Sequence, residues 1–153
     1  MKPDFKPKRL APYPMDQKME SLTLKWLDEM KQKGFIRSSD SRMTSPLFWV
    51  AKKVKEEFRP CQDYRHVNTG TIPNAYPLPT ISDLLLRLRG QRYFTKFDVR
   101  WGYNNVRIKE GDEWKAAFST PFGAYEPTVM FFGLCNSPAT FQRMMNEYFW
   151  DFL

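Results

Sequence analysis

Apolar residues recur at helical spacing soon after the N-terminal segment. The residues that would share one helix face are Met19, Leu22, Trp26, Leu27 and Met30. Asp16 lies just before them and can accept a hydrogen bond as an N-cap, while Gly34 lies just after them and favours a helix end. The pattern predicts one amphipathic helix at the start of the fold.

A β-hairpin is predicted in the next part of the chain. Residues 47–50 and Phe58 are apolar, and the charged run 52–57 lies between them. Two such segments joined by a short polar run are typical of paired strands. Residues 35–36, followed by the Ser-rich stretch 38–41, indicate another short extended segment. We therefore expect a hairpin with a charged connecting loop that carries three lysines.

Prolines organise the middle of the chain. They keep residues 69–79 extended, because proline fixes its own backbone and disfavours helix in the residue before it. Thr80 can cap a short helix over residues 81–88, and Gly90 favours its end. This segment is expected to link two lobes of the fold.

Residues 92–99 alternate in character. Tyr93, Phe97 and Val99 would share one face with Thr95, and Asp98 would lie on the opposite face. A period of two predicts a β-strand. Further strands are expected at 106–108, 114–119 and 122–125, separated by Gly and Pro turn signals.

The last predicted element is a helix that begins at Ser137 and Pro138, a favoured start. Its apolar positions recur at helical spacing through Phe141, Met144, Met145, Tyr148, Phe149 and Phe152. The pattern keeps the chain helical to its last residues. Helices and strands in mixed order predict an α+β fold.

Composition favours a folded, basic domain. The chain has 153 residues, of which 42% are hydrophobic and 16% aromatic, so it can bury a core. Its formal net charge of +7 favours a polyanionic partner. Residues 1–14 are rich in Pro, Lys and Arg and indicate an extended, mobile arm. Without an apolar span or a signal peptide, we expect an intracellular protein, in the cytoplasm, a particle or the nucleus, that contacts no membrane.

Few residues could carry chemistry by themselves. His66 is the only histidine, and neither a nucleophile elbow nor a phosphate-binding loop is present. Asp98 could hold a divalent cation, although an exposed aspartate on a strand is the plainer interpretation. The basic residues that could contact phosphates, or simply form a solvated face, are Lys52, Lys53, Lys55, Arg59 and Arg65.

Several strings then point to a family by their order and spacing. They are KGFIR at 33–37, RPCQDYR at 59–65, YPLP at 76–79, YFTKFD at 93–98, WGY at 101–103, GDEWKAAF at 111–118, FGL at 132–134 and NSPATFQ at 136–142. In this set the chain resembles the reverse transcriptase domain of gypsy-type LTR retrotransposons, from about residue 20 onward. No one of these strings would be specific alone, but their co-linear order is.

The resemblance implies the fingers and partial palm of a right-hand polymerase. After the arm at 1–14, residues 15–91 would form fingers, 92–105 the palm strand with the catalytic aspartate, 106–135 fingers again and 136–153 a palm helix. The implied activity is RNA-directed DNA polymerisation within a Pol polyprotein. Its implied partners are an RNA or DNA template with its primer, deoxynucleoside triphosphates, and the remaining polyprotein domains: the rest of the palm, the thumb, RNase H and integrase.

The resemblance also assigns roles to individual residues. Asp98 would be catalytic and bind two Mg²⁺ ions, which orient the reacting groups in phosphoryl transfer. The residues implied to bind the incoming nucleotide are Lys52, Lys53, Arg59, Val99, Gly102, Tyr103, Phe132 and Gly133. Those implied to contact template or primer are Arg65, Asn68, Pro138 and Gln142.

Some positions depart from the family pattern. Val54 to Glu57 replace a turn that usually carries glycine, Phe131 replaces a usual proline, and Pro127 replaces a usual aromatic. The sequence also ends before a Tyr-x-Asp-Asp string, so we expect this chain alone to be inactive and its palm face to be left uncovered. A non-catalytic template-binding module and a decayed element copy are the alternatives.

Overall fold

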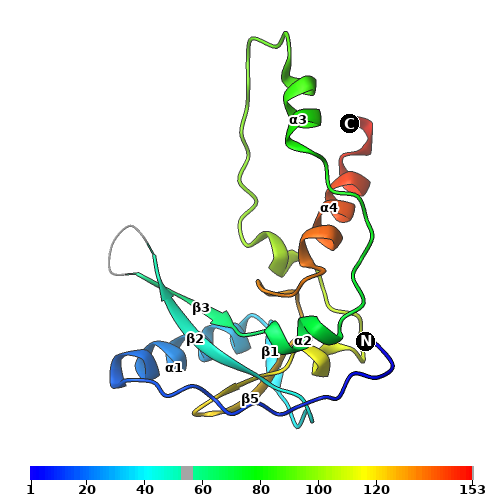
Figure 1. Cartoon of the computed structure of the whole chain (residues 1–153). Helices are drawn as coiled ribbons and strands as arrows, with labels where there is room; N and C mark the ends of the chain where they lie inside the picture. Colours follow the sequence, from blue (N-terminus) through cyan, green and yellow to red (C-terminus); the bar gives the residue numbers. More distant parts are fainter. Residues whose placement is uncertain (53–56, 153) are drawn as a thin grey trace.

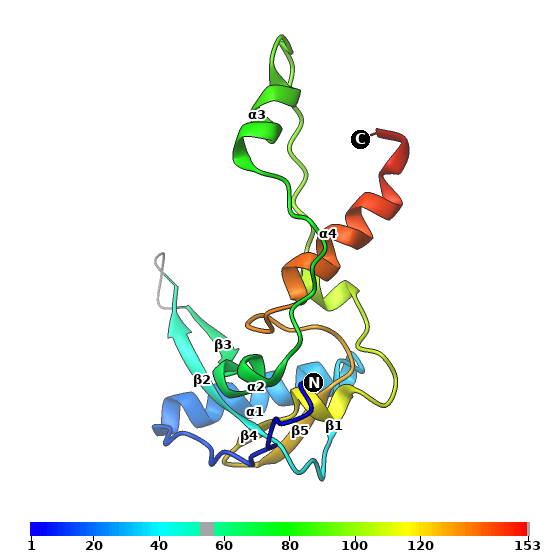
Figure 2. The same ribbon diagram turned by 45° about the vertical axis from the view of Figure 1, so that its right-hand side comes forward.

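The computed structural model describes residues 1–52 and 57–152 of the chain. A compact body carries a five-stranded sheet, and a lobe projects from it (Figures 1 and 2). The body comprises residues 1–70 and 106–136 without the four undescribed residues. The projecting lobe comprises residues 71–105 and 137–152, so the chain leaves the body after residue 70, returns to it at residue 106 and leaves it again with the last helix.

Helix α1, Gln17–Gln32, forms where the apolar periodicity predicts it. The Asp16 side chain accepts a hydrogen bond from the Met19 backbone N–H at 2.7 Å, which satisfies a donor that the first helical turn leaves free. Gly34 follows with a φ of 68° and turns the chain toward the sheet. The predicted cap, helix and stop are all confirmed.

The sheet is built from two distant parts of the chain. Its strands are β1 (Ile36–Ser38), β2 (Ser45–Ala51), β3 (Phe58–Gln62), β4 (Phe118–Thr120) and β5 (Gly123–Pro127), in the order β1-β5-β4-β2-β3. The predicted hairpin is confirmed as the antiparallel pair β2–β3, in which Leu47 faces Gln62. Strand β4 pairs antiparallel with β5 and parallel with β2.

A single core lies between α1 and the sheet. Leu27 and Met30 of α1 are buried against Ile36, Leu47 and Phe118. Trp26 lies with its ring centroid 5.7 Å from that of Phe118 and 6.0 Å from that of Phe131. Phe131, at the position where the family usually has proline, is therefore a core residue.

Two short helical elements of the body were not predicted. Helix α2, Arg65–Gly70, follows β3 directly, and the 3-10 turn η2, Glu113–Ala116, precedes β4. Fully buried Tyr64 connects them, because its hydroxyl donates to the Ala116 carbonyl at 2.8 Å. Burial raises the pKa of the Tyr64 phenol, so the hydroxyl keeps the proton that it donates.

The N-terminal arm is extended as predicted, but it is not a free segment. The Leu10 N–H donates to the Thr44 carbonyl at 3.0 Å, and the Leu10 carbonyl accepts from Thr44 Oγ1 and Ser119 Oγ. At its start, the Lys2 N–H donates to the Gly70 carbonyl. These contacts place the arm along the body, and its mobility stays a prediction.

The projecting lobe contains helix α3, Ile81–Leu88, which begins with a capping box between Thr80 and Asp83. Residues 92–99 are extended but form no strand, which contradicts the predicted palm strand. Their alternation would suit a half-buried strand, but no described strand lies beside them to supply hydrogen bonds. All residues from 77 to 101 are exposed.

The last predicted helix is α4, Ser137–Tyr148, with Pro138 in its first turn. It leaves the body and runs into the projecting lobe (Figure 1). The helix ends at Tyr148, and a 3-10 turn, η3 (Trp150–Phe152), follows it, so the prediction of helix to the chain end is wrong. Of its residues only Ser137 and Ala139 are buried. Among the described residues, no helix has the length and apolar character needed to cross a membrane.

Candidate functional site

An aromatic cluster joins the projecting lobe to the body. Tyr103, in the 3-10 turn η1 (Gly102–Asn105), lies with its ring centroid 4.8 Å from that of Phe132 and 5.5 Å from that of Phe141 on α4. A Cβ at Gly102 would stand 3.1 Å from Phe141, so glycine allows this close approach. Phe132 is 66% exposed, which leaves the cluster one open aromatic face.

A strained residue turns the chain into this cluster. Trp101 has a φ of 54°, the only positive φ of a non-glycine residue in the described chain. This conformation is costly for a large side chain and is typical of functional segments. Lys33 Nζ lies 3.7 Å from the Trp101 ring centroid, and Asn105 Nδ2 donates to the Trp101 carbonyl. Both contacts stabilise the turn that presents Tyr103.

Asp98 lies on the extended segment just before this turn. It is exposed, and Val99 beside it is 45% exposed. Within residues 1–52 and 57–152, no group of three or more His, Cys, Asp and Glu side chains could hold a metal ion. Among the described residues, Asp98 is therefore not part of such a group, and one exposed carboxylate does not by itself fit a metal ion.

The predicted phosphate contacts lie on the β2–β3 hairpin. Lys52, just after β2, pairs with Glu57 at 2.8 Å, and this pairing lowers the pKa of the Glu57 carboxyl. Lys53 and Lys55 lie outside the described residues. Arg59 is exposed on β3 opposite Val50. The hairpin thus presents Arg59 to solvent, whereas Lys52 already has an acidic neighbour.

Arg65 is held by a neighbouring carboxylate. Asp63 accepts from Arg65 Nε at 2.8 Å and from its terminal nitrogen at 2.7 Å, a bidentate pair. Tyr13 of the N-terminal arm donates its hydroxyl to Asp63 Oδ2 at 2.8 Å. The Arg65 hydrogen bonds hold the pKa of Asp63 well below its usual range, and the Tyr13 hydrogen bond lowers it further.

Two further predicted contacts make bonds within the protein. Asn68 donates from Nδ2 to the Gly133 carbonyl at 2.8 Å and accepts from the Cys135 N–H at 3.0 Å. It thereby ties α2 to the loop before α4. Gln142 donates to Asn146 on the same helix, and Pro138 is exposed.

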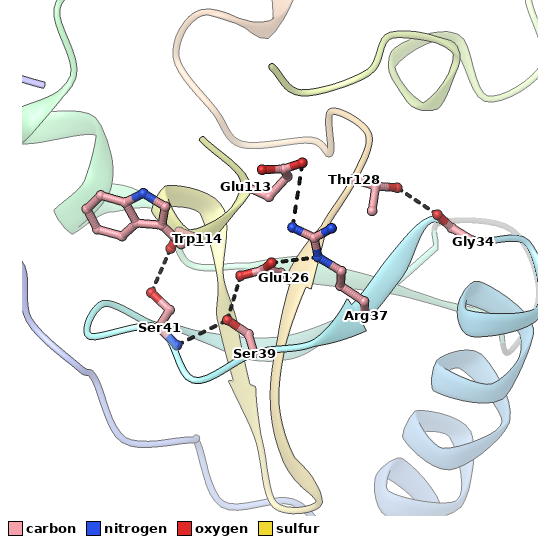
Figure 3. A network of polar contacts seen from close by, with 8 residues as sticks. All are labelled: Gly34, Arg37, Ser39, Ser41, Glu113, Trp114, Glu126 and Thr128. Atoms are coloured by element: carbon pink, nitrogen blue, oxygen red, sulfur yellow. Dashed lines mark hydrogen bonds and ion pairs between the residues drawn. The ribbon is translucent and has the colours of Figure 1, made fainter. Parts of the chain in front are cut away.

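A polar network joins strands β1 and β5 to the turn η2 (Figure 3). Arg37 of β1 donates to Glu126 of β5 at 2.7 Å and lies 3.7 Å from Glu113 of η2. Ser39 also donates to Glu126. Glu113 is almost fully buried, and one of its oxygens has no hydrogen-bond partner among the described residues. The arginine is therefore the cation that compensates two shielded carboxylates.

The structure brings together some predicted residues and leaves others apart. Tyr103 contacts Phe132, Gly102 lies against Phe141, and Asn68 contacts Gly133. Arg59 lies on β3 and Arg65 begins α2, both in the body, whereas Asp98 lies on the projecting lobe. Sequence reasoning missed Tyr13, Asp63 and Phe141 as neighbours of these positions. A signal existed only for Asp63, since a carboxylate two residues from an arginine can pair with it.

Comparison with known proteins gives consistent results. Residues 50–153 match the family described as reverse transcriptase (RNA-dependent DNA polymerase). The chain is 41% identical over 140 residues to the retrovirus-related Pol polyprotein from transposon opus of Drosophila melanogaster, covering 89% of this chain and 14% of that protein. It is 39% identical over 122 residues to the transposon Tf2-3 polyprotein of Schizosaccharomyces pombe, covering 78% and 9% respectively. The chain thus spans a small part of the length of these relatives.

Solved structures share the fold. The native protease-reverse transcriptase of prototype foamy virus has a TM-score of 0.87 and 25% identity, over 97% of this chain and 20% of that one. A foamy viral protease-reverse transcriptase in complex with RNA/DNA hybrid has a TM-score of 0.79 and 21% identity, over 95% and 20%. The predicted α+β fold with the arrangement of fingers and partial palm is confirmed.

Proposed function

We propose that this chain, which belongs to the reverse transcriptase (RNA-dependent DNA polymerase) family, contributes fingers and part of the palm to a polymerase that copies retrotransposon RNA into DNA. Its relatives are transposon polyproteins, and the chain matches only a part of each. We assign it to the gypsy-type LTR retrotransposons on the order of its sequence strings. The fingers would comprise residues 15–91 and 106–135, and the palm residues 92–105 and 136–153.

The observation that carries this proposal is the aromatic cluster around Tyr103. An exposed Phe132 ring beside Tyr103, on a glycine turn that follows Asp98, forms a surface on which a nucleotide base and sugar can pack. Val99, Gly102 and Gly133 border this surface in our assignment. At this surface the Tyr103 ring would exclude a 2′-hydroxyl on the sugar and so select deoxynucleotides.

Charge supports the assignment of partners. The net charge of +7 and the exposed Arg59 and Arg65 favour phosphate groups. We assign Arg59, with Lys52 and Lys53, to the triphosphate, and Arg65 with Asn68, Pro138 and Gln142 to template and primer. A phosphate that binds Lys52 must compete with the Glu57 carboxylate. We therefore expect weaker triphosphate binding than in a hairpin without Glu57.

The family uses divalent metal ions, but the described residues do not make a metal site. Asp98 offers one exposed carboxylate, and a divalent cation bound by oxygen needs several ligands. We assign Asp98 as one ligand of a Mg²⁺ site whose other ligands come from elsewhere in the polyprotein. The bound cations would offset the negative charge that develops in phosphoryl transfer.

The proposal is tested by primer extension on an RNA template with the chain in its full polyprotein. Asp98→Asn should lower the rate at least about a hundredfold, because it removes a charged group at the reacting phosphates. Asp40→Asn, which neutralises an exposed aspartate of the body, should leave the rate unchanged. Equal activity of the Asp98→Asn variant and the parent would sink the assignment of Asp98.

A second function is favoured by the exposed arginines Arg59 and Arg65. The chain could grip a template-primer duplex through phosphates without catalysis. Binding that weakens with salt but does not change with Mg²⁺, together with no primer extension by the polyprotein, would support this function over the first.

A further inference from the structure

The N-terminal arm reaches the residues that hold Arg65. Leu10 fixes the arm through hydrogen bonds to Thr44 and Ser119. Three residues later, Tyr13 packs its ring edge-on against Phe48 of β2, with 6.3 Å between centroids. The arm is therefore seated where its tyrosine meets the hairpin.

Tyr13 meets there a carboxylate that is itself well fixed. Asp63 is only 12% exposed in its side chain, and its backbone N–H donates to the Pro46 carbonyl at 2.9 Å. Its Oδ2 accepts both the Tyr13 hydroxyl and an Arg65 nitrogen, while Oδ1 accepts Arg65 Nε. Donors from Tyr13 and from Arg65 therefore fix the orientation of the Asp63 carboxylate.

Arg65 itself is largely in solvent. Its side chain is 86% exposed, although two of its N–H groups are bonded to Asp63. An exposed arginine normally samples many rotamers, and fixing it costs conformational entropy when it binds. Here that cost is met within the folded protein, and the remaining N–H groups face outward for a phosphate.

We propose that Tyr13 is a positioning residue: its hydroxyl fixes Asp63, which orients the Arg65 guanidinium for template phosphate. The inference rests on the proposed role of Arg65 in template binding and adds to it a part for the N-terminal arm. When the arm is seated, Arg65 is pre-oriented. When the Tyr13 hydroxyl is absent, Asp63 keeps the Arg65 side chain, and only the longer bond from the Arg65 backbone N–H to Oδ1, at 3.2 Å, still restrains the carboxylate.

The test is the affinity of the 153-residue chain for a fluorescein-labelled DNA primer annealed to an RNA template with a single-stranded 5′ extension, measured by anisotropy. Arg65→Gln should raise Kd about tenfold through the loss of a phosphate contact. Tyr13→Phe keeps the ring against Phe48 and should raise Kd about three- to fivefold. In the Arg65→Gln background, Tyr13→Phe should have no further effect, because coupled residues are not additive.

The matched control is Tyr148→Phe, which removes an exposed hydroxyl without a hydrogen bond among the described residues. It should leave Kd unchanged. If Arg65→Gln has no effect, the proposed template role of Arg65 fails and the inference falls with it. If Arg65→Gln weakens binding but Tyr13→Phe does not, or if Tyr13→Phe acts equally in both backgrounds, the inference alone is overturned.

A second measurement needs no nucleic acid. The NMR order parameter of the Arg65 Nε–H bond should be high in the parent chain and fall in Tyr13→Phe, while the melting temperature stays nearly the same. A tyrosine that only packs the arm would not change the order parameter of Arg65. An unchanged value in Tyr13→Phe therefore also overturns the inference.

Discussion

The surroundings of single side chains shift their pKa values in this protein. Asp63 is the clearest case, since Arg65 and then Tyr13 stabilise its ionised form. Cys61, one strand position from Gln62, shows the opposite effect, because burial raises the pKa of its thiol. At the end of β3, the hydrogen bonds to Asp63 thus favour its ionised carboxylate, whereas burial of Cys61 favours its neutral thiol.

The lowered pKa of Asp63 predicts a loss of stability in acid. The folded-state pKa lies below the unfolded value of about 4, so the contribution of Asp63 is present above that value and is lost as pH falls toward the folded pKa. Thermal melts from pH 6 down to pH 3 should therefore show a steeper fall in Tm for the parent chain than for Asp63→Asn. Identical slopes for the two proteins would contradict this account.

At the scale of elements, β1, β5 and η2 are joined by the Arg37 network. Glu126 is 12% exposed and Glu113 only 7%, while Arg37 lies at the surface over both. A shielded carboxylate without its cation is far more costly than a solvated one. The network should therefore matter more for stability than a surface ion pair of the same type.

Arg37→Gln tests this difference. It should lower Tm clearly more than Arg143→Gln, which breaks an ion pair between Arg143 and Glu147 on the exposed face of α4. Differential scanning calorimetry of both variants and the parent measures the effect. A similar small drop in the two variants would show that Glu113 and Glu126 do not depend on Arg37.

Local elements could be predicted from the sequence where a cap and a period coincide. Asp16 with the α1 pattern, and Thr80 with the α3 pattern, placed both helices correctly. The parallel pairing of β2 with β4 could not be predicted, because Ser45 and Phe118 carry no local signal for one another. Helix α2 was missed because six residues are too few to show a period.

The segment 92–99 shows the limit of periodicity. Its alternation reports which side chains could face a core, but a strand also needs a neighbour to accept its hydrogen bonds. Within the candidate site, the roles proposed for Tyr103 and Phe132 come only from family resemblance. The contacts of Tyr103 with Phe132 and with Phe141 needed the structure, because they join three separate segments.

At the scale of the whole molecule, apolar side chains gather on the projecting lobe. The exposed ones include Ile81, Leu85 and Leu86 on α3, Tyr93 and Phe97 on the extended segment, and Trp150 and Phe152 in η3. Surfaces of this kind mark an interface or cause association. The isolated chain is therefore expected to self-associate as its concentration rises.

Substitution of α3 should separate association from stability. Leu85 is 62% exposed and Leu86 64%, so Leu85→Ser with Leu86→Ser removes little packing and should change unfolding free energy by less than about 1 kcal/mol. Sedimentation velocity should show less association. Leu47→Ala, in the core, should instead cost about 2–5 kcal/mol. Unchanged association in the α3 variant would mean that another surface is responsible.

The parallel pairing of β2 with β4 also limits the order in which the sheet can form. Strand β3 ends at Gln62, but β4 begins only at Phe118, after the whole excursion into the lobe. During synthesis, β2 and β3 are therefore made well before β4. The edge of β2 that pairs with β4 stays unpaired until β4 emerges from the ribosome. Closing such a long loop is slow. An unpaired strand edge can pair with another chain, so the nascent protein passes through a stage that is prone to aggregation.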